Sequence, residues 1–186
     1  MALHKPTKAE IQAAQNQTVS DIIAPNLKVL FCGINPSLYS AVVGHHFARP
    51  GNRFWKTLHG AGFTDRLFPA AEDQDLPKLG FGITNIVDRA TARADELAPE
   101  ELVAGHQKLA LKIQQYQPQV LAILGISAYR TAFKQPKAKM GLQLERLYDT
   151  RIWVLPNPSG LNAHYQLEDL KRVYQELRFA VEDRLP

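Results

Sequence analysis

The sequence lacks the features that mark membrane-spanning and secreted proteins. No apolar run approaches the roughly 20 residues that a membrane-spanning helix needs. The first residues contain neither the basic segment nor the apolar core of a secretory signal peptide. Cys32 is the only cysteine, so no disulfide can form within the chain. These absences favour a reducing setting, and we expect a cytoplasmic protein, associated with the nucleoid if it is bacterial.

Signatures of metal-dependent and nucleotide-dependent enzymes are also missing. The chain has no glycine-rich dinucleotide fingerprint, no phosphate-binding loop of the Walker type and no HExxH zinc motif. His45, His46 and His164 offer three imidazoles for a zinc site, yet adjacent histidines do not easily point the same way. Cys32 lies within an apolar run, which favours an inert core position over a nucleophile. We therefore expect no metal and no organic cofactor.

The composition is that of an ordinary globular protein. Of the 186 residues, 45% are hydrophobic and 22% are charged, which suits one compact α/β domain. The formal net charge is +4 and the isoelectric point is about 9.2. This mild basic excess is compatible with binding to nucleic acid but does not establish it.

Apolar runs of strand length alternate with amphipathic segments of helix length. We expect strands at 28–34, 81–87, 119–125 and 151–156 with an extra strand at 142–148, and helices at 52–62, 99–116, 127–133 and 166–185. A long loop is expected over 35–51, and a loop or short helix over 64–80. Buried strands that alternate with helices predict a three-layer α/β/α fold with a short, mainly parallel central sheet.

The chain divides into a polar N-terminal segment and one domain. Residues 1–20 carry no dense apolar face, and we expect a tail or short helix there. Residues 21–186 contain no linker or internal repeat, which predicts a single domain.

Four polar segments follow the predicted strands at their carboxyl ends. They are Asn35-Pro36-Ser37, Asp88-Arg89, Gly125-Ile126-Ser127 and Asn157-Pro158-Ser159-Gly160-Leu161. Ligands of open parallel sheets bind at this edge, so segments far apart in sequence are expected to form one cleft. Gly125 before a short helix leaves nucleotide binding as an alternative on fold alone.

The first and last of these segments share the sequence Asn-Pro-Ser. Asparagine offers an amide that both accepts and donates hydrogen bonds. A serine can contact a phosphate through its hydroxyl group and its backbone N–H. A single Asn-Pro more often marks a simple turn, but two such turns at one sheet edge favour a functional site.

These motifs resemble those of the mismatch-specific uracil/thymine-DNA glycosylases, a branch of the uracil-DNA glycosylase superfamily. GINPS at 33–37 is similar to the first motif of that family, GINPG, and NPSGL at 157–161 to the second. Further likeness lies in GHHFARPGNRFW at 44–55, GITNIVDRAT at 82–91 and YQPQVLAILG at 116–125. The resemblance runs from about Ile22 to the end of the last predicted helix.

The resemblance implies a DNA-repair enzyme. It would flip uracil, and related pyrimidines mispaired with guanine, out of the duplex and hydrolyse the N-glycosidic bond to leave an abasic site. By the same resemblance Asn35 positions the attacking water and Phe47 stacks on the flipped base. The base pocket would comprise Gly33, Ile34, Ser40, Phe47, Asn85 and Asn157, with Asn85 at a position that tunes which base is accepted.

The resemblance also implies contacts to double-stranded DNA. Leu161 would fill the gap that the flipped nucleotide leaves, as apolar wedges do. The DNA-contacting set would be Ser37, Ser159, Gly160, Leu161, Asn162 and His164. Two positions depart from the family pattern. Ser37 replaces a glycine, which would be costly if that residue needed a positive φ. Asn162-Ala163-His164 stands where relatives often have serine followed by arginine. The sequence therefore leaves open whether the guanine opposite the flipped base is recognised.

Two alternatives follow from the same residues. Asp88 is either a second carboxylate that activates water, or a structural residue that forms a salt bridge, for example with Arg89 or Arg93, or caps a helix. A different class of function is a non-catalytic or very slow protein that binds damaged or abasic DNA, which Ser37 and Asn157 make conceivable. In either case we expect a monomer without membrane contact, because the cleft needs only one chain.

Overall fold

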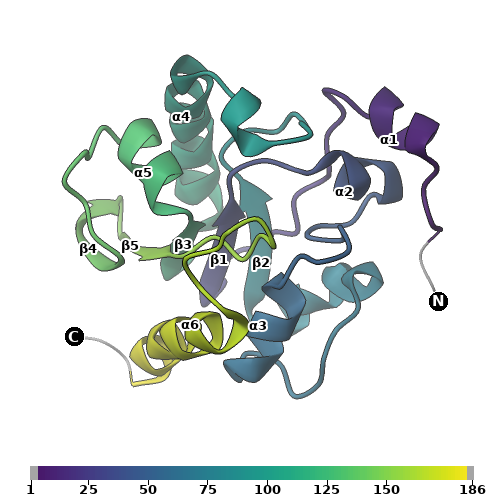
Figure 1. Ribbon diagram of the computed structural model, residues 1–186. Helices are drawn as coiled ribbons and strands as arrows, with labels where there is room; N and C mark the ends of the chain where they lie inside the picture. Colours follow the sequence, from purple (N-terminus) through teal and green to yellow (C-terminus); the bar gives the residue numbers. More distant parts are fainter. Residues whose placement is uncertain (1–3, 184–186) are drawn as a thin grey trace.

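A five-stranded sheet forms the centre of the molecule in the computed structural model, which describes residues 4–183 (Figure 1). Its strands are β1 (Val29–Gly33), β2 (Phe81–Asn85), β3 (Val120–Leu124), β4 (Gly141–Leu147) and β5 (Thr150–Leu155). They lie in the order β2-β1-β3-β5-β4. All pairs are parallel except β4 with β5, which is antiparallel. The predicted short, mainly parallel sheet and its extra strand are therefore confirmed.

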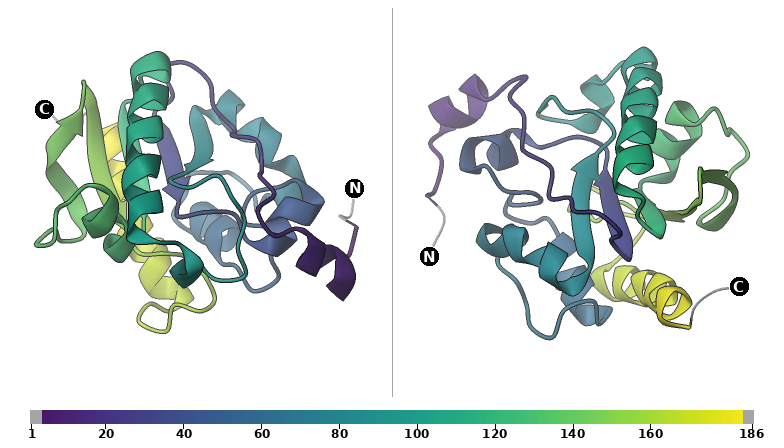
Figure 2. Two further views of the ribbon diagram at one scale, coloured as in Figure 1. Left: turned by 90° about the horizontal axis from the view of Figure 1, so that it is seen from above. Right: turned by 180° about the vertical axis from the view of Figure 1, so that it is seen from behind.

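Helices cover both faces of the sheet, as predicted (Figures 1 and 2). One layer holds α4 (Pro99–Tyr116) and α5 (Ile126–Ala132), and the other holds α3 (Phe54–Gly60), the 3-10 segment η1 (Ala70–Leu79) and α6 (Leu167–Glu182). Alternate side chains of β1 pack against the two helical layers. Phe31 packs with α3 and α6 residues, whereas Leu30 and Cys32 pack with α4 and α5 residues. Continuous burial along β1, β2 and β3 explains their unbroken apolar sequences.

The two long helices match the sequence pattern closely. Helix α4 begins at Pro99, whose missing N–H costs nothing in a first turn, and buries Leu109 and Ile113. Helix α6 buries Leu170, Tyr174 and Leu177 on one face. Its predicted last residues, 184 and 185, lie outside the part of the chain that the structure describes.

The predicted long loop over 35–51 is wrong in part, because it contains the helix α2 (Leu38–Val43). Ser37 caps its start, with the side-chain oxygen accepting a 3.1 Å hydrogen bond from the Ser40 N–H. Gly44 ends it with a φ of +74°. Six residues are too few to show a helical period, so only these two caps signalled the helix.

The N-terminal segment packs on the rest of the molecule instead of forming a loose tail. Helix α1 (Lys8–Ala13) begins with a capping box between Thr7 and Glu10 and lies against α2. Ala14 and Val19 are buried with residues of α2 and of the loop after β2. Across residues 4–183, no helix is both long and apolar enough to cross a membrane.

Candidate active site

A cleft of about 340 Å³ opens at the carboxyl ends of the parallel strands. Much of its lining lies at or just beyond the ends of the parallel strands: residues 33–37 for β1, Asn85 for β2, Leu124 for β3, and Asn157, Ser159, Leu161 and Asn162 for β5. The other lining residues are 91–95 after β2, and Ser40, His46, Phe47, Arg49 and Asn52. The two Asn-Pro-Ser segments therefore converge as predicted. Residues 125–127 and Asp88 do not line it, and the loop at 91–95 takes the place that sequence reasoning gave to Asp88.

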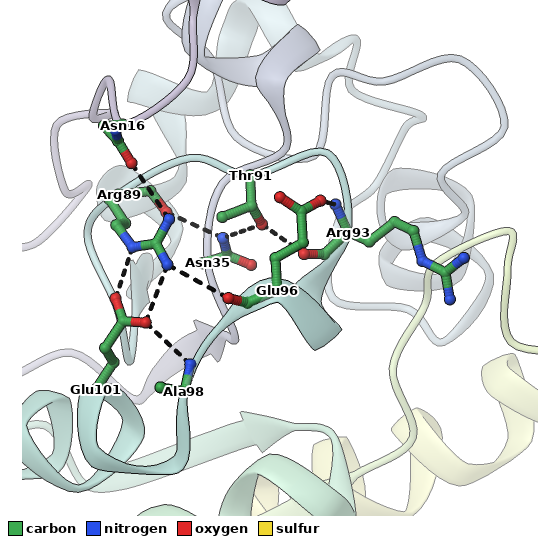
Figure 3. Close-up of polar contacts among 8 residues, drawn as sticks. All are labelled: Asn16, Asn35, Arg89, Thr91, Arg93, Glu96, Ala98 and Glu101. Carbon is green, nitrogen blue, oxygen red and sulfur yellow. Dashed lines mark hydrogen bonds and ion pairs between the residues drawn. The ribbon is translucent and has the colours of Figure 1, made fainter.

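Asn35 is held in one orientation by residues of the loop after β2. Its Nδ2 donates to the Arg89 carbonyl oxygen at 2.9 Å and to the Thr91 hydroxyl at 2.8 Å (Figure 3). The Thr91 hydroxyl in turn donates to the Arg93 carbonyl at 2.7 Å. Because both amide hydrogens are used, the Asn35 Oδ1 is left as a fixed acceptor at the cleft, with no protein partner among residues 4–183.

Ser37 meets no backbone strain at the position where the family motif has glycine. Its φ is −73°, well inside the range open to every residue, and it serves as the cap of α2. The Ser37 hydroxyl donates to the Ser40 hydroxyl at 3.1 Å. The Ser40 hydroxyl accepts the Ala48 N–H at 3.2 Å, which ties α2 to the loop that carries Phe47.

Phe47, Gly33 and Asn85 form one wall of the cleft. A side chain at Gly33 would meet the Asn85 Oδ1 at 2.5 Å and the Phe47 ring at 3.3 Å, so any larger residue there would displace Asn85 from its present position. Phe47 stacks on Phe54 with ring centroids 4.1 Å apart. Its φ of +53° is rare for an aromatic residue, which shows that surrounding contacts fix the ring at this place.

A buried carboxylate holds the turn before Phe47. Asp73 of η1 is fully buried, and its Oδ2 accepts the His46 N–H at 3.0 Å. Its Oδ1 lies 2.9 Å from Nδ1 of His45. The His46 ring is also buried, with Nε2 2.9 Å from the Ser20 carbonyl oxygen, and burial lowers the pKa of His46. Sequence reasoning missed Asp73, because nothing in the polar stretch 64–80 distinguishes this acid from its neighbours.

The second Asn-Pro-Ser segment presents an amide donor to the cleft. The Asn157 Oδ1 accepts the Ser159 N–H at 2.9 Å, which makes a local turn. That bond sets the orientation of the amide and leaves Nδ2 without a protein acceptor among the described residues. The Asn157 carbonyl accepts from Asn162 at 3.0 Å. Asn157 and Asn35 line the same cleft, which therefore contains both an amide donor and an amide acceptor without a protein partner among the described residues.

Arg53 holds this segment in place and was also missed from the sequence. Its guanidinium donates to four carbonyl oxygens, those of Pro158, Ser159, Asn162 and Tyr165, at 2.5–3.3 Å. Gly160 is pressed against the backbone of Gly51, where a side chain would approach a carbonyl oxygen to 2.7 Å. Leu161 is 68% exposed at the rim of the cleft, and His164 is exposed outside it.

Asp88 faces two lysines outside the cleft. Its carboxylate oxygens lie 3.6 Å from Nζ of Lys108 and of Lys112. This geometry favours the structural ion pair over water activation, although the partners are lysines of α4 and not Arg89 or Arg93. Arg89 pairs with Glu101 instead, at 2.6 and 2.9 Å.

The remaining sequence candidates behave as core and surface residues. Cys32 is fully buried, and this burial raises the pKa of its thiol, as expected of an inert core cysteine. His45 and His46 face different partners, and His164 is exposed. Within the described part of the chain, no three acidic, histidine or cysteine side chains group as metal ligands would.

Comparison with known proteins agrees with this architecture. The family model of the uracil DNA glycosylase superfamily matches residues 20–178. The fold is similar to the solution NMR structure of a candidate uracil DNA glycosylase from Methanosarcina acetivorans, with a TM-score of 0.55 and 17% identity. That match covers 88% of this chain and 98% of the other. Because the family model spans most of the sequence, this chain belongs to the uracil DNA glycosylase superfamily, whose members are DNA N-glycosylases.

Proposed function

We propose that this protein is a glycosylase of the mismatch-specific uracil/thymine branch, which removes uracil paired with guanine from double-stranded DNA. The orientation of the Asn35 amide supports this proposal most strongly, because it leaves a fixed acceptor at the cleft, and this acceptor would hold the attacking water. The motifs GINPS and NPSGL support the branch. A uracil mispaired with guanine is also cheaper to unpair and flip than one paired with adenine.

In the proposed reaction, Asn35 Oδ1 accepts one hydrogen of a water and turns its oxygen toward C1′ of the sugar. The water oxygen bonds to C1′ as the bond from C1′ to N1 of uracil breaks, and the electron pair leaves with N1. An amide cannot take the proton of the water, so that proton passes to solvent. We therefore expect a modest rate.

The opposite side of the cleft would receive the base. Phe47 would stack on the flipped ring, and Asn157 Nδ2 would donate to a carbonyl oxygen of the leaving pyrimidine as negative charge develops there. Ile34 would contribute backbone to the pocket floor, and Asn85 would select among bases. Both residues line the same cleft.

The loop after β5 would contact DNA. Leu161 is the exposed apolar side chain at the rim and would enter the space that the flipped nucleotide leaves. Ser37, Ser159, Gly160, Asn162 and His164 would contact the backbone or the opposite base. All these residues come from one chain, so we propose a monomer that needs no cofactor.

Single-turnover base release tests this function. Labelled duplexes containing G·U, G·T or A·U, and single-stranded uracil DNA, are incubated with excess enzyme, and abasic sites are revealed with alkali. We expect fastest release from G·U, and a loss of about 100-fold or more in Asn35→Ala, comparable with the removal of other oriented polar groups. Gln115→Ala removes an exposed amide on α4, away from the cleft, and should keep the wild-type rate.

Other results would revise the proposal in defined ways. Equal release from A·U and G·U would show that the opposite guanine is not read. An unchanged rate in Asn35→Ala would remove the water-holding role of this residue. If no duplex is cut while abasic DNA is bound tightly, the protein is a binder of damaged DNA and the enzymatic function is excluded.

A further inference from the structure

The orientation of Asn35 depends on a loop that has little regular structure of its own. Both partners of its Nδ2, the Arg89 carbonyl and the Thr91 hydroxyl, lie between the end of β2 and the short 3-10 segment η2 (Ala94–Glu96). Three backbone bonds tie the loop to the strand side: the Ile86 and Val87 N–H groups donate to the Gly33 and Ile34 carbonyls at 2.9 Å, and the Thr91 N–H donates to the Pro36 carbonyl at 3.3 Å. None of these three bonds is made by Arg89, whose carbonyl holds the Asn35 amide, so the position of this residue depends on further support.

The side chain of Arg89 supplies this support from two directions (Figure 3). Its Nε and Nη2 donate to the two carboxylate oxygens of Glu101 at 2.6 and 2.9 Å. Nη1 donates to Asn16 Oδ1 at 3.2 Å, and Nη2 reaches the Glu96 carbonyl at 3.5 Å. Such a paired contact between guanidinium and carboxylate fixes direction as well as distance.

Both supports are held by further hydrogen bonds of their own segments. Glu101 stands in the first turn of α4 and also accepts the Ala98 N–H at 2.9 Å. The bonds from Arg89 and Ala98 hold the pKa of Glu101 at about 2, so its carboxylate stays ionised at neutral pH. Asn16 belongs to the N-terminal segment, whose backbone pairs with the loop through two bonds of Ala90, at 3.0 Å to Asn16 and 2.7 Å to Gln17.

We propose that Arg89 is a positioning residue, which through its contacts with Glu101 and Asn16 fixes the loop that orients Asn35. The N-terminal segment, which precedes the region matched by the family model, then helps to hold the loop that orients Asn35. This inference rests on the proposed function for its effect on rate. Its effect on the Asn35 side chain does not depend on that function.

Arg89→Met tests the inference, because it keeps most of the side-chain volume and removes every polar contact that the side chain makes. Arg178→Met is the matched control, since Arg178 pairs with Glu182 on α6 and is 28% exposed, against 29% for Arg89. We expect Arg89→Met to release uracil about tenfold more slowly in single turnover, while affinity for uracil DNA changes less than twofold. The Arg178→Met rate should equal that of wild type.

A double variant separates positioning from general destabilisation. In the Asn35→Ala background, Arg89→Met should cause no further loss of rate, because the group that it orients is gone. A tenfold loss in that background too would overturn the inference. Glu101→Ala and Asn16→Ala remove one support each, and they provide the same comparison if Arg89→Met does not fold.

Exchange of the Asn35 side-chain amide hydrogens with water gives a readout that needs no turnover. In an NMR spectrum these signals are assigned by their loss in Asn35→Ala. We expect exchange to become at least tenfold faster in Arg89→Met and to stay unchanged in Arg178→Met. If the wild-type protein releases base, and Arg89→Met changes neither the exchange of the Asn35 amide hydrogens nor the rate of base release, the positioning role fails and the proposed function stands. If the wild-type protein releases no base but Arg89→Met still speeds the exchange of the Asn35 amide hydrogens, the proposed function fails and the positioning role stands.

Discussion

The side chain of Asn35 illustrates how much chemistry depends on the orientation of one amide. A carboxylate is the stronger acceptor for a water, but it cannot donate. In this protein the position requires two donated hydrogen bonds, to Arg89 and to Thr91. An amide is the side chain that offers both donors and still presents an acceptor to the cleft.

Replacement of this amide by a carboxylate is therefore expected to harm the protein. In Asn35→Asp, a carboxylate oxygen would face the Arg89 carbonyl at about the present 2.9 Å, with no hydrogen between them. We expect a loss of about 1–3 kcal/mol in the free energy of unfolding at neutral pH. Base release should be slower than in wild type. Thermal unfolding and single-turnover assays measure both effects, and a stable variant with a higher rate would contradict the role given to the two donors.

Individual site residues were predictable from sequence only where a motif carries them. Asn35, Phe47 and Asn157 stand in recognisable motifs, and all three line the cleft. Arg53 and Thr91 also lie in segments that resemble the family, 44–55 and 82–91, but nothing in the sequence distinguished them as site residues. Their importance lies in contacts with carbonyl groups far along the chain, which no local pattern reveals.

At the scale of elements, η1 shows how a segment without a clear pattern can shape the site. It carries Asp73, whose two oxygens face His45 and His46 immediately before Phe47. The positive φ of Phe47 costs free energy, and the contacts of Asp73 help to offset that cost. A segment whose sequence is distinguished only by its polarity thus helps to hold the residue proposed to stack on the base.

We expect Asp73→Asn to weaken this arrangement. The amide oxygen can still accept the His46 N–H, but the NH₂ group then faces Nδ1 of His45, and a bond forms there only if this ring nitrogen carries no proton. Where it carries one, two donors face each other and the bond is lost. A lost bond at a fully buried site should cost about 1–3 kcal/mol, or roughly 2–10 °C in the unfolding temperature. Base release should fall as Phe47 loses its fixed position. Asp75→Asn, on the same segment, replaces a partly exposed acid paired with Lys78 and should leave both measurements near wild type.

Elements were predictable in proportion to their length and periodicity. The four parallel strands and α4 and α6 were found close to their observed bounds, because burial on one or both faces imposes a strong pattern. Helix α2 was missed because it spans six residues. The packing of the N-terminal segment was missed because it buries only small patches, centred on Ala14 and Val19.

At the scale of the whole molecule, the cleft is an assembly of segments that are far apart in sequence. Asn35 and Asn157 are brought together by parallel strands β1 and β5, which flank β3. The N-terminal segment joins the same assembly from outside the sheet. Its Ser20 carbonyl lies 2.9 Å from the buried His46 ring, next to the residue proposed to stack on the base. The stability of the fold and the geometry of the cleft are thus linked through this histidine.

This link predicts how stability depends on pH. Burial lowers the pKa of His46 below its ordinary value of 6.5, and the opposing influence of the Ser20 carbonyl and of Asp73 is smaller. The unfolded chain therefore takes up a proton at a higher pH than the folded chain does. The contribution of His46 to the free energy of unfolding is complete above about pH 6.5. It is lost as the pH falls below that value toward the lower pKa of the folded state.

Chemical denaturation at several pH values between 7.5 and 5 measures this dependence. The free energy of unfolding of wild type should fall as the pH is lowered through this range. In His46→Gln, whose amide can still donate to the Ser20 carbonyl, the fall should be smaller because a titrating group has been removed. Gln115→Ala should keep the wild-type dependence. Equal slopes in wild type and His46→Gln would mean that the buried imidazole does not couple protonation to folding, and that the Ser20 contact is not sensitive to pH.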